Sequence, residues 1–492
     1  MRKSSALLVT LCLIHAGCST NPATGKREFN IVSESQALAM GAQAHQQIIQ
    51  EFGVYNEVPA LNEMVTKMGR GLAAASDRPN LPWNFTILDA PMVNAMALPG
   101  GYIYVTRGIL ERMNSQDELA GVIAHEIAHV SARHAEQRMS QSQLAQFGLV
   151  IGSVLAGPAA AQAYGGLAEL GATLLFQRYS RQQETHADVL GTAYMTEAGY
   201  NPHGAENMLL VLQRLDRGES SPLDRYFIDH PDPRKRVADV RGKIASLQQS
   251  SPAIGSAPLD RDTFVRKLDG IIVGASTLET TVTDEAVFQR RTGMIVPIPS
   301  GWQAVVPPGA LFQMAPRKSR GTGLIVQQVP LIKLQGGGNV QQAVRGALQQ
   351  NRLTYQGSTN AASRSGERFT VDIWSGRTSN GVVRVESTQF AMGDQAVIFL
   401  FINERPERNR SELATVLDSM TFDRQRARSA EPARMKVGPP RANEDWASVA
   451  SRATGNREDA TEVANINGFD VSTPFPRNVL LKLPADVIAN EE

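Results

Sequence analysis

Cysteine is scarce in this chain of 492 residues: there are two, too few for a disulfide framework. An excess of charge of one sign is also lacking, because 49 Lys and Arg face 48 Asp and Glu. This balance excludes a nucleic-acid partner bound through phosphate neutralisation. Histidine is absent from residues 231–492, so imidazole chemistry must belong to the first half. The apolar content of 42% supports folded cores, and the length predicts about three domains.

Residues 1–18 have the pattern of a secretory signal: two basic residues, then an apolar run too short to span a bilayer. The run ends in Ala-Gly-Cys18, which resembles a bacterial lipobox, although His15 stands where that pattern prefers Leu. Ser19 rather than Asp follows the cysteine. We therefore expect a periplasmic lipoprotein, anchored through Cys18 to the inner leaflet of the outer membrane. Ordinary signal cleavage is the alternative.

The rest of the chain is predicted to be α+β, in three units. Residues 19–250 are mainly helical with a few β-rich runs, and 251–284 connect them to the next unit. Residues 285–423 alternate short β-rich runs with two helical segments, which predicts an antiparallel α+β domain of unknown role. Residues 424–443, rich in Arg and Pro, are a predicted linker, and 444–492 form a small α+β module.

The spacing of apolar residues also predicts single elements. Helices are expected over residues 33–77, 117–139, 161–198, 205–215, 234–247, 340–353 and 411–420. Strands are expected over residues 85–89, 102–106, 294–298, 324–329, 368–373, 382–389, 396–402 and 479–484.

An HExxH sequence, His125 to His129, lies in the predicted helix 117–139. Positions four apart share one face of a helix, so both imidazoles can bind one metal ion. Glu126 would then lie beside a metal-bound water and act as general base. The spacing predicts a zinc site, against the alternative of two packed histidines.

A catalytic zinc needs a third protein ligand and one open position for water. Glu184 and Asp188 are again four positions apart, so they share a helical face. They can supply one carboxylate ligand and one carboxylate that orients a ligand imidazole. A solvated helix face is the alternative. His186 points roughly 200° away from Glu184 and is expected at the surface.

Three linked motifs resemble one family. HEIAHVSARH (residues 125–134), SRQQETHAD (180–188) and NAMALPGGYIYVTRG (94–108) are similar to CAAX-prenyl-protease-type zinc metallopeptidases of the gluzincin group. Within that group they resemble exported bacterial lipoproteins of the BepA/LoiP type. The resemblance covers roughly residues 20–247. It implies a mainly helical zincin-type peptidase domain with a small edge-strand sheet.

The resemblance also implies residue roles. His125, His129 and Glu184 match the ligands of one Zn²⁺ per chain, Glu126 matches the catalytic base, and Asp188 matches the carboxylate behind a ligand. It implies a zinc-dependent peptidase of the periplasm.

The strand before the HExxH helix is expected to border the cleft. An extended substrate peptide could add to its edge at Asn94, Ala95 and Ala97 through main-chain hydrogen bonds, and an ordinary hairpin strand is the alternative.

The remaining histidines need separate treatment. His230, in a segment that resembles one near the family's metal, is a predicted catalytic residue. It could stabilise the transition state, contact substrate, or act as a fourth ligand that closes the site at rest; a helix-entry histidine is the alternative. His134 lies about 140° from His129 on a continuous helix and is therefore assigned to structure. Arg133 lies nearer the ligand face, where it could pair with a carboxylate or be solvated.

Between Arg138 and Glu169 lie 30 uncharged residues, long enough to span a bilayer. A single span would put His125 and Glu184 on opposite sides of the membrane, and the legs of a hairpin would be too short. We therefore expect an amphipathic flap or a pair of helices that covers the cleft and could touch the membrane surface.

The histidine-free half has no predicted catalytic set, so binding or scaffolding is its expected role. Residues 444–492 weakly resemble a lysin motif, which implies contact with peptidoglycan, although the Gly-Asp-Thr turn usual in such modules is absent. A small α+β tail without that role is the alternative.

The leading hypothesis is an envelope zinc endopeptidase that cleaves misfolded or envelope proteins and peptides. The alternatives are a chaperone or assembly factor for outer-membrane proteins, with a zinc site closed by His230, and a wall-binding protein.

Overall fold

In the computed structural model the chain divides into two compact units. The first is built from residues up to 88, from 92–271 and from 435–483, and the second from 89–91, 272–434 and the residues after 483. The structure describes residues 18–141, 179–215, 230, 233–307, 310–317, 321–330, 340–378, 381–392, 395–404 and 412–485. Helices and mainly antiparallel sheets confirm the predicted α+β class.

The first unit contains the HExxH sequence and most of the helices. Its elements before residue 272 are β1 (Cys18–Thr20), β2 (Arg27–Phe29), α2 (Glu34–Phe52), α3 (Pro59–Ala74), β3 (Asn84–Leu88), β4 (Ala95–Leu98), β5 (Tyr102–Thr106), α4 (Arg107–Arg112), α5 (Gln116–Ser131), α8 (Arg181–Glu197), α9 (His203–Leu215), α11 (Pro233–Ser250) and α12 (Arg261–Arg266).

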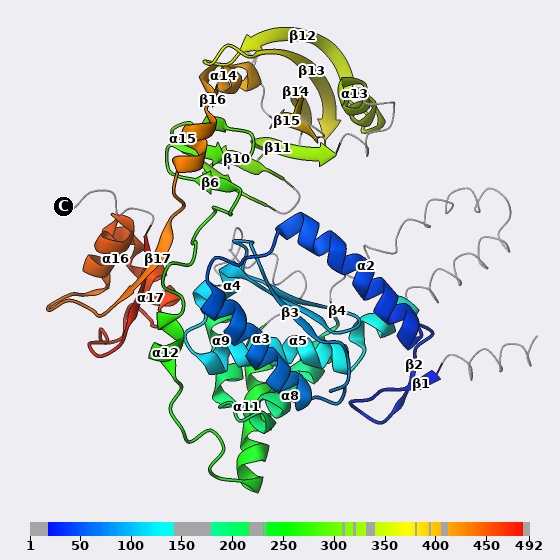
Figure 1. Cartoon of the computed structure of the whole chain (residues 1–492), viewed down its shortest axis with the longest axis vertical. Helices are drawn as coiled ribbons and strands as arrows, with labels where there is room; N and C mark the ends of the chain where they lie inside the picture. The colour runs from blue at the N-terminus through cyan, green and yellow to red at the C-terminus, as the bar shows by residue number, and fades with distance from the viewer. Residues whose placement is uncertain are drawn as a thin grey trace, which may run out of the picture. The chain divides into compact units, whose positions relative to one another are not determined.

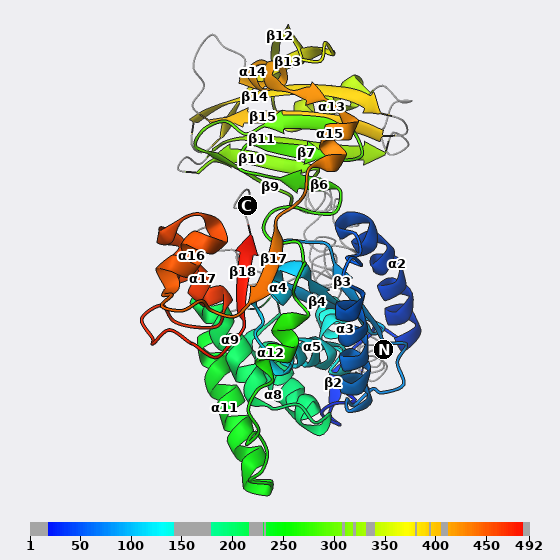
Figure 2. The ribbon, with the colours of Figure 1, turned by 60° about the vertical axis from the view of Figure 1, so that its left-hand side comes forward.

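A three-stranded sheet and the helix α5 form the centre of this unit. The strand order is β3-β5-β4, with β3 parallel and β4 antiparallel to β5. Figures 1 and 2 show the sheet between α2 on one side and α5, α8, α9 and α11 on the other. Every residue of α5 from Asp117 to Ser131 is buried, and the Ser115 hydroxyl caps its first turn by accepting a hydrogen bond from the Glu118 amide. The HExxH sequence therefore lies in the core.

Two stretches predicted to be helical are divided in the structure. Residues 33–77 form two helices, since α2 ends at Phe52 and α3 begins at Pro59, where proline suits a first helical turn. The prediction of a single helix over 117–139 is wrong. That helix ends at Ser131, and Arg133 takes a left-handed φ of 57° before residues 134–141 become helical again.

The chain returns to the first unit after residue 434. It forms β17 (Arg434–Gly438), α16 (Trp446–Thr454), the short 3₁₀ helix η4 (Arg457–Asp459), α17 (Ala460–Ile466) and β18 (Leu481–Ala485). The two strands pair in one sheet, and Figure 2 shows them beside α16 and α17. The strand β17 lies inside 424–443, the stretch expected as a linker.

The second unit contains two antiparallel sheets. One has the order β16-β8-β7-β6 and the other, whose stacked strands are clear in Figure 2, β12-β13-β14-β15-β11-β10-β9. The largest of several hydrophobic clusters described in this unit contains residues of both sheets and of α14. The elements are β6 (Thr280–Val282), β7 (Ala286–Gln289), β8 (Met294–Pro297), β9 (Trp302–Val305), β10 (Phe312–Pro316), β11 (Thr322–Pro330), α13 (Val340–Gln350), β12 (Thr354–Ala362), β13 (Arg368–Thr378), β14 (Gly381–Met392), β15 (Gln395–Asn403), α14 (Glu412–Ser419), β16 (Thr421–Phe422) and α15 (Arg424–Ser429).

Candidate metal centre

The two histidines of the HExxH sequence lie one turn apart on α5 and face the same point. His125 and His129 are 2% and 1% exposed, and their Nε2 atoms are 3.0 Å apart. This is the arrangement that the four-residue spacing predicts for a helix.

The helix α8 brings Glu184 to the same point. Ser180 begins α8 with a capping box that includes Gln183, so the carboxylate lies in the first turn. Glu184 Oε1 is 3.3 Å from His129 Nε2, and its Oε2 is 3.6 Å from His125 Nε2.

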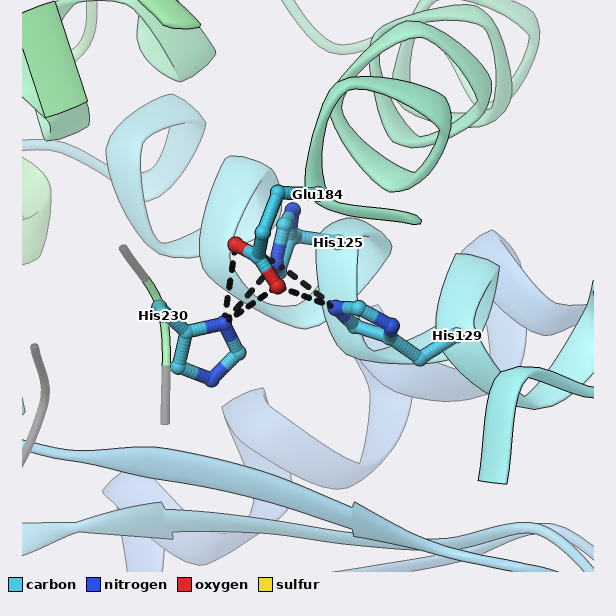
Figure 3. Close-up of side chains that lie close together, drawn as sticks. All are labelled: His125, His129, Glu184 and His230. Atoms are coloured by element: carbon cyan, nitrogen blue, oxygen red, sulfur yellow. Dashed lines mark hydrogen bonds and ion pairs between the residues drawn. The ribbon is translucent and has the colours of Figure 1, made fainter. Parts of the chain in front are cut away.

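His230 completes the cluster. Its Nδ1 lies 3.1 Å from both Glu184 oxygens and 3.4 Å from His125 Nε2. One ligand atom from each of His125, His129, Glu184 and His230 can be chosen so that all lie within 4.8 Å of one another. Figure 3 shows the four side chains pointing toward one another from α5, α8 and the segment of His230.

Asp188, the second carboxylate of α8, lies behind His125. Its Oδ1 is 2.9 Å from His125 Nδ1. Arg236 of α11 donates two hydrogen bonds to the same carboxylate, over 2.7 and 2.8 Å, and its Nη1 is 3.0 Å from Glu184 Oε2. Arg236 was not predicted to contact the site. The one sequence signal was its place six residues after His230, in the segment that resembles the family.

His134 contacts the second ligand histidine, which its assignment to structure did not foresee. Its Nδ1 lies 2.9 Å from His129 Nδ1, and its Nε2 lies 3.1 Å from Nδ1 of His186. The predicted angle of about 140° assumed a continuous helix, and the turn at Arg133 removes that assumption. His186, expected at the surface, is only half-buried but bonded to His134. Arg133 itself donates a hydrogen bond to the Val32 carbonyl.

The donor set of this cluster fits a cation. His125 Nδ1 faces the Asp188 carboxylate and so carries a proton, and His129 Nδ1 faces His134. With protons on both Nδ1 atoms, the two Nε2 lone pairs point at each other across 3.0 Å, with the Glu184 carboxylate beside them. Lone pairs in this arrangement repel unless a proton or a metal cation lies between them. Two imidazoles and a carboxylate are ligands that zinc accepts.

Glu126 lies beside this cluster with an unused oxygen. It is 1% exposed, and its Oε1 is 3.8 Å from His230 Nε2. Among the residues that the structure describes, none donates a hydrogen bond to Glu126 Oε2. Burial raises the pKa of this carboxyl. A carboxyl group with a raised pKa and a free oxygen is suited to taking up and returning a proton.

Charge within the cluster is balanced by two groups on or near α11. Burial by itself raises the pKa of Glu184, but His230 and Arg236 beside it lower that pKa well below the ordinary range. Burial lowers the pKa of His230, yet the Glu184 charge outweighs it and the net direction is upward. Burial lowers the pKa of His129, so this imidazole stays neutral and available as a ligand.

The predicted substrate strand is β4. Asn94 directly precedes it, Ala95 pairs with Val105, and Ala97 pairs with Ile103. Because the sheet order is β3-β5-β4, the other edge of β4 has no strand partner among the described residues. The helix α5 packs against β4, so this edge belongs to the same part of the first unit as the cluster.

The predicted flap falls almost wholly outside the described residues, which stop at 141 and resume at 179. At the point where they resume, Tyr179 stacks on the His129 ring with centroids 3.7 Å apart, and Arg138 lies 3.9 Å over the Tyr179 ring. Over the described part of the chain, no helix has both the length and the apolar character that crossing a bilayer requires.

The part of the chain that contains this cluster is similar to known proteins. Residues 59–244 match peptidase family M48. The chain is 28% identical over 232 residues to the mitochondrial metalloendopeptidase OMA1 of Schizosaccharomyces pombe, covering 46% of this chain and 66% of that protein. It is 28% identical over 238 residues to the beta-barrel assembly-enhancing protease of Escherichia coli, and the match covers 46% of this chain and 48% of that protein. It is 26% identical over 249 residues to the metalloprotease YcaL of Escherichia coli, and the match covers 49% of this chain and 95% of that protein.

The chain thus spans less than two thirds of the first of these relatives and about half of the second. Among solved structures, cyanobacterial PsbP from Synechocystis matches 27% of this chain and 86% of its own, with 9% identity and a TM-score of 0.20. That score is too low to define a shared fold.

Proposed function

The chain belongs, through residues 59–244, to peptidase family M48, and on that premise we propose that it is a zinc endopeptidase of the bacterial cell envelope. The observation that carries the proposal is the convergence of His125, His129 and Glu184 beside a buried Glu126 whose Oε2 has no donor among the described residues. The three convergent residues are the proposed zinc ligands. Asp188 orients His125, and Arg236 holds Asp188.

The chain's own residues supply the proton transfers of peptide hydrolysis. Glu126 takes a proton from the attacking water and returns it to the leaving nitrogen, so the base of one step is the acid of the next. A bound zinc ion would lower the pKa of that water and polarise the scissile carbonyl. The outer edge of β4, at Ala95 and Ala97, would hold the substrate as an added strand, whereas the amide and carbonyl of Asn94, the third predicted position, are already bonded to Thr106.

The sequence and the relatives' names support the proposed substrate class and location. One relative is called a beta-barrel assembly-enhancing protease, which suits misfolded or envelope proteins as substrates. The lipobox-like ending at Cys18 suits anchoring to the inner leaflet of the outer membrane, with the peptidase in the periplasm. The order β17-α16-α17-β18 suits the weak lysin-motif resemblance, so peptidoglycan is a proposed further partner.

A second candidate function rests on His230. Because its Nδ1 lies among the ligand atoms, His230 can occupy the position that a catalytic zinc keeps for water. A site closed in this way suits a chaperone or assembly factor for outer-membrane proteins that cleaves only when His230 moves away.

The test compares three forms of the full chain. We expect Glu126→Gln to lower casein cleavage by at least about a hundredfold, since general acid–base catalysis contributes at least that much. Its zinc content, measured by atomic emission, should equal that of wild type because the substitution leaves all three proposed ligands in place. Undiminished cleavage by this variant would refute the proposed mechanism.

In parallel, His230→Ala separates the two functions: increased cleavage favours the closed-site chaperone, and reduced cleavage favours the peptidase.

A further inference from the structure

The two imidazoles of the HExxH sequence are supported in different ways. His125 Nδ1 faces the carboxylate of Asp188, which Arg236 holds in turn. His129 Nδ1 instead faces another imidazole, His134, at 2.9 Å. A ligand histidine needs a partner at its second nitrogen, because that partner decides which nitrogen carries the proton.

The contacts of His134 determine the proton positions along a chain of three imidazoles. If His129 offers Nε2 to the metal, its Nδ1 carries the proton and donates to His134 Nδ1. His134 then has its own proton on Nε2, which points at His186 Nδ1 over 3.1 Å. His186 accepts through Nδ1 and carries its proton on Nε2. All three rings are neutral in this arrangement, and each contact has one donor and one acceptor.

The surroundings of His134 favour its role as an acceptor. It is 1% exposed, and its two ring nitrogens face two other imidazoles over 2.9 and 3.1 Å, so one nitrogen must accept and the other donate. The opposite tautomer would turn its Nδ1 into a donor, and the proton of His129 would move to Nε2, where the ligand atoms converge.

The backbone places this ring by an unusual turn. The helix α5 ends at Ser131, and Arg133 takes a φ of 57°, a conformation that costs a non-glycine residue free energy. The turn is stabilised by the hydrogen bond from Arg133 to the Val32 carbonyl. His134 therefore leaves the axis of α5 and reaches back to His129.

We propose that His134 is a positioning residue for the metal centre: it accepts the proton of His129 Nδ1 and thereby directs His129 Nε2 to the metal, while His186 fixes the tautomer of His134. This inference rests on the proposed function, because it takes His129 as a ligand.

The test uses two variants of equal size. In His134→Asn, Oδ1 replaces Nδ1 as an acceptor on the same carbon, Cγ, whereas His134→Leu has a methyl group there. We expect zinc affinity, measured by competition with a chromogenic chelator, to fall about 10–100-fold in the Leu variant and to stay near wild type in the Asn variant. His186→Leu should lose less zinc affinity than His134→Leu, because water can replace the half-buried imidazole of His186.

Each outcome has a definite meaning. Equal affinities for Asn and Leu variants that both fold, as judged by circular dichroism, overturn the proposal. If wild type binds no zinc, the proposed function falls and the inference falls with it, whereas tight binding by both wild type and His134→Leu overturns the inference alone. Should His134→Leu not fold, long-range ¹H–¹⁵N spectra of the zinc-loaded wild type decide: the proposal requires the proton of His134 on Nε2, and a proton on Nδ1 overturns it.

Discussion

Arg236 touches both carboxylates of the centre that α8 supplies. It holds Asp188 with two hydrogen bonds and lies 3.0 Å from Glu184, and its side chain is only 3% exposed. A buried ion pair of this kind contributes little net free energy compared with an apolar pair, but removing one partner leaves the other charge buried and unpaired. Loss of Arg236 would therefore leave the buried carboxylates of Asp188 and Glu184 without its positive charge.

We predict that Arg236→Met destabilises the metal-free protein by roughly 3–5 kcal/mol at neutral pH, measured by urea denaturation. The pKa of Asp188 is lowered in the folded state, where burial raises it but Arg236 outweighs burial. The Asp188–Arg236 pair therefore gives its full contribution to the free energy of unfolding above the ordinary carboxyl pKa. This contribution is lost as pH falls through the lower pKa of folded Asp188, so the difference in unfolding free energy between variant and wild type should narrow in acid.

Arg241→Met is the matched control on the same helix. Arg241 pairs with Glu206 over 2.7 Å but is 59% exposed, so its loss should cost less than about 1 kcal/mol. Equal losses for the two arginines would contradict the argument from burial.

Residues of the centre divide into those that local spacing revealed and those that it did not. The pairs His125–His129 and Glu184–Asp188 were predicted because four-residue spacing on a helix is a local property. The contact of His134 with His129 was not predicted because the end of the helix at Ser131 depends on an αL residue that is not glycine, for which the sequence offers no signal.

At the scale of elements, the centre depends on how closely α8 approaches α5. Gly191, one turn after Asp188, makes this approach possible: a Cβ there would lie 2.9 Å from the His125 amide nitrogen and 3.0 Å from the Ala124 carbonyl carbon. These are backbone atoms of a fully buried helix and cannot turn aside. The distance between the two helices therefore sets the distance between the carboxylates and the imidazoles.

We predict that Gly191→Ala pushes α8 away from α5, destabilises the protein by about 1–3 kcal/mol and weakens zinc binding, as calorimetry and chelator competition would measure. Gly242 in α11 provides the control, because a Cβ there meets nothing within 4 Å. Gly242→Ala should stabilise by about 0.5–1 kcal/mol through helix propensity and leave zinc binding unchanged. A similar gain in both variants would show that α8 and α5 are not in close contact at Gly191.

In the second unit, local sequence patterns predicted some strands and missed others. The longer strands β11, β13, β14 and β15 were predicted from their β-rich runs. The strands β6, β7, β9, β10 and β12 were not, because strands of three to five residues carry little alternation and β12 is mostly exposed. Their pairing with neighbours, not their composition, makes them strands.

At the scale of the whole molecule, the last segment of the chain is part of the unit that holds the metal centre. Lys482 of β18 is fully buried, and its Nζ donates to the carbonyls of Glu111 and Met113, over 2.8 and 2.9 Å, just before α5. Arg214 of α9 donates to the Gly468 carbonyl, and Arg112 pairs with Glu462. The segment is thus held to the rest of the first unit by polar contacts, of which those of Lys482 are buried.

We predict that Lys482→Met destabilises the protein by about 1–3 kcal/mol in urea denaturation, because two buried carbonyls lose their donor. Lys436, on the paired strand β17 but exposed, is the control, and its change to Met should leave stability unchanged within error. If Lys482→Met unfolds at the same urea concentration as wild type, the last segment does not contribute to the stability of the peptidase.

The sequence by itself determined which residues are proposed for the chemistry: the two pairs on helices follow from four-residue spacing, the choice of Glu184 as third ligand follows from the family resemblance, and the α+β class follows from the pattern of apolar residues. Only the tertiary structure decided how that chemistry is supported. Arg236, His134 and Lys482 act on partners between 5 and 371 positions away in the sequence, through turns and helix contacts. Such contacts leave no local pattern, because each depends on the packing of elements whose order along the chain does not reveal their neighbours.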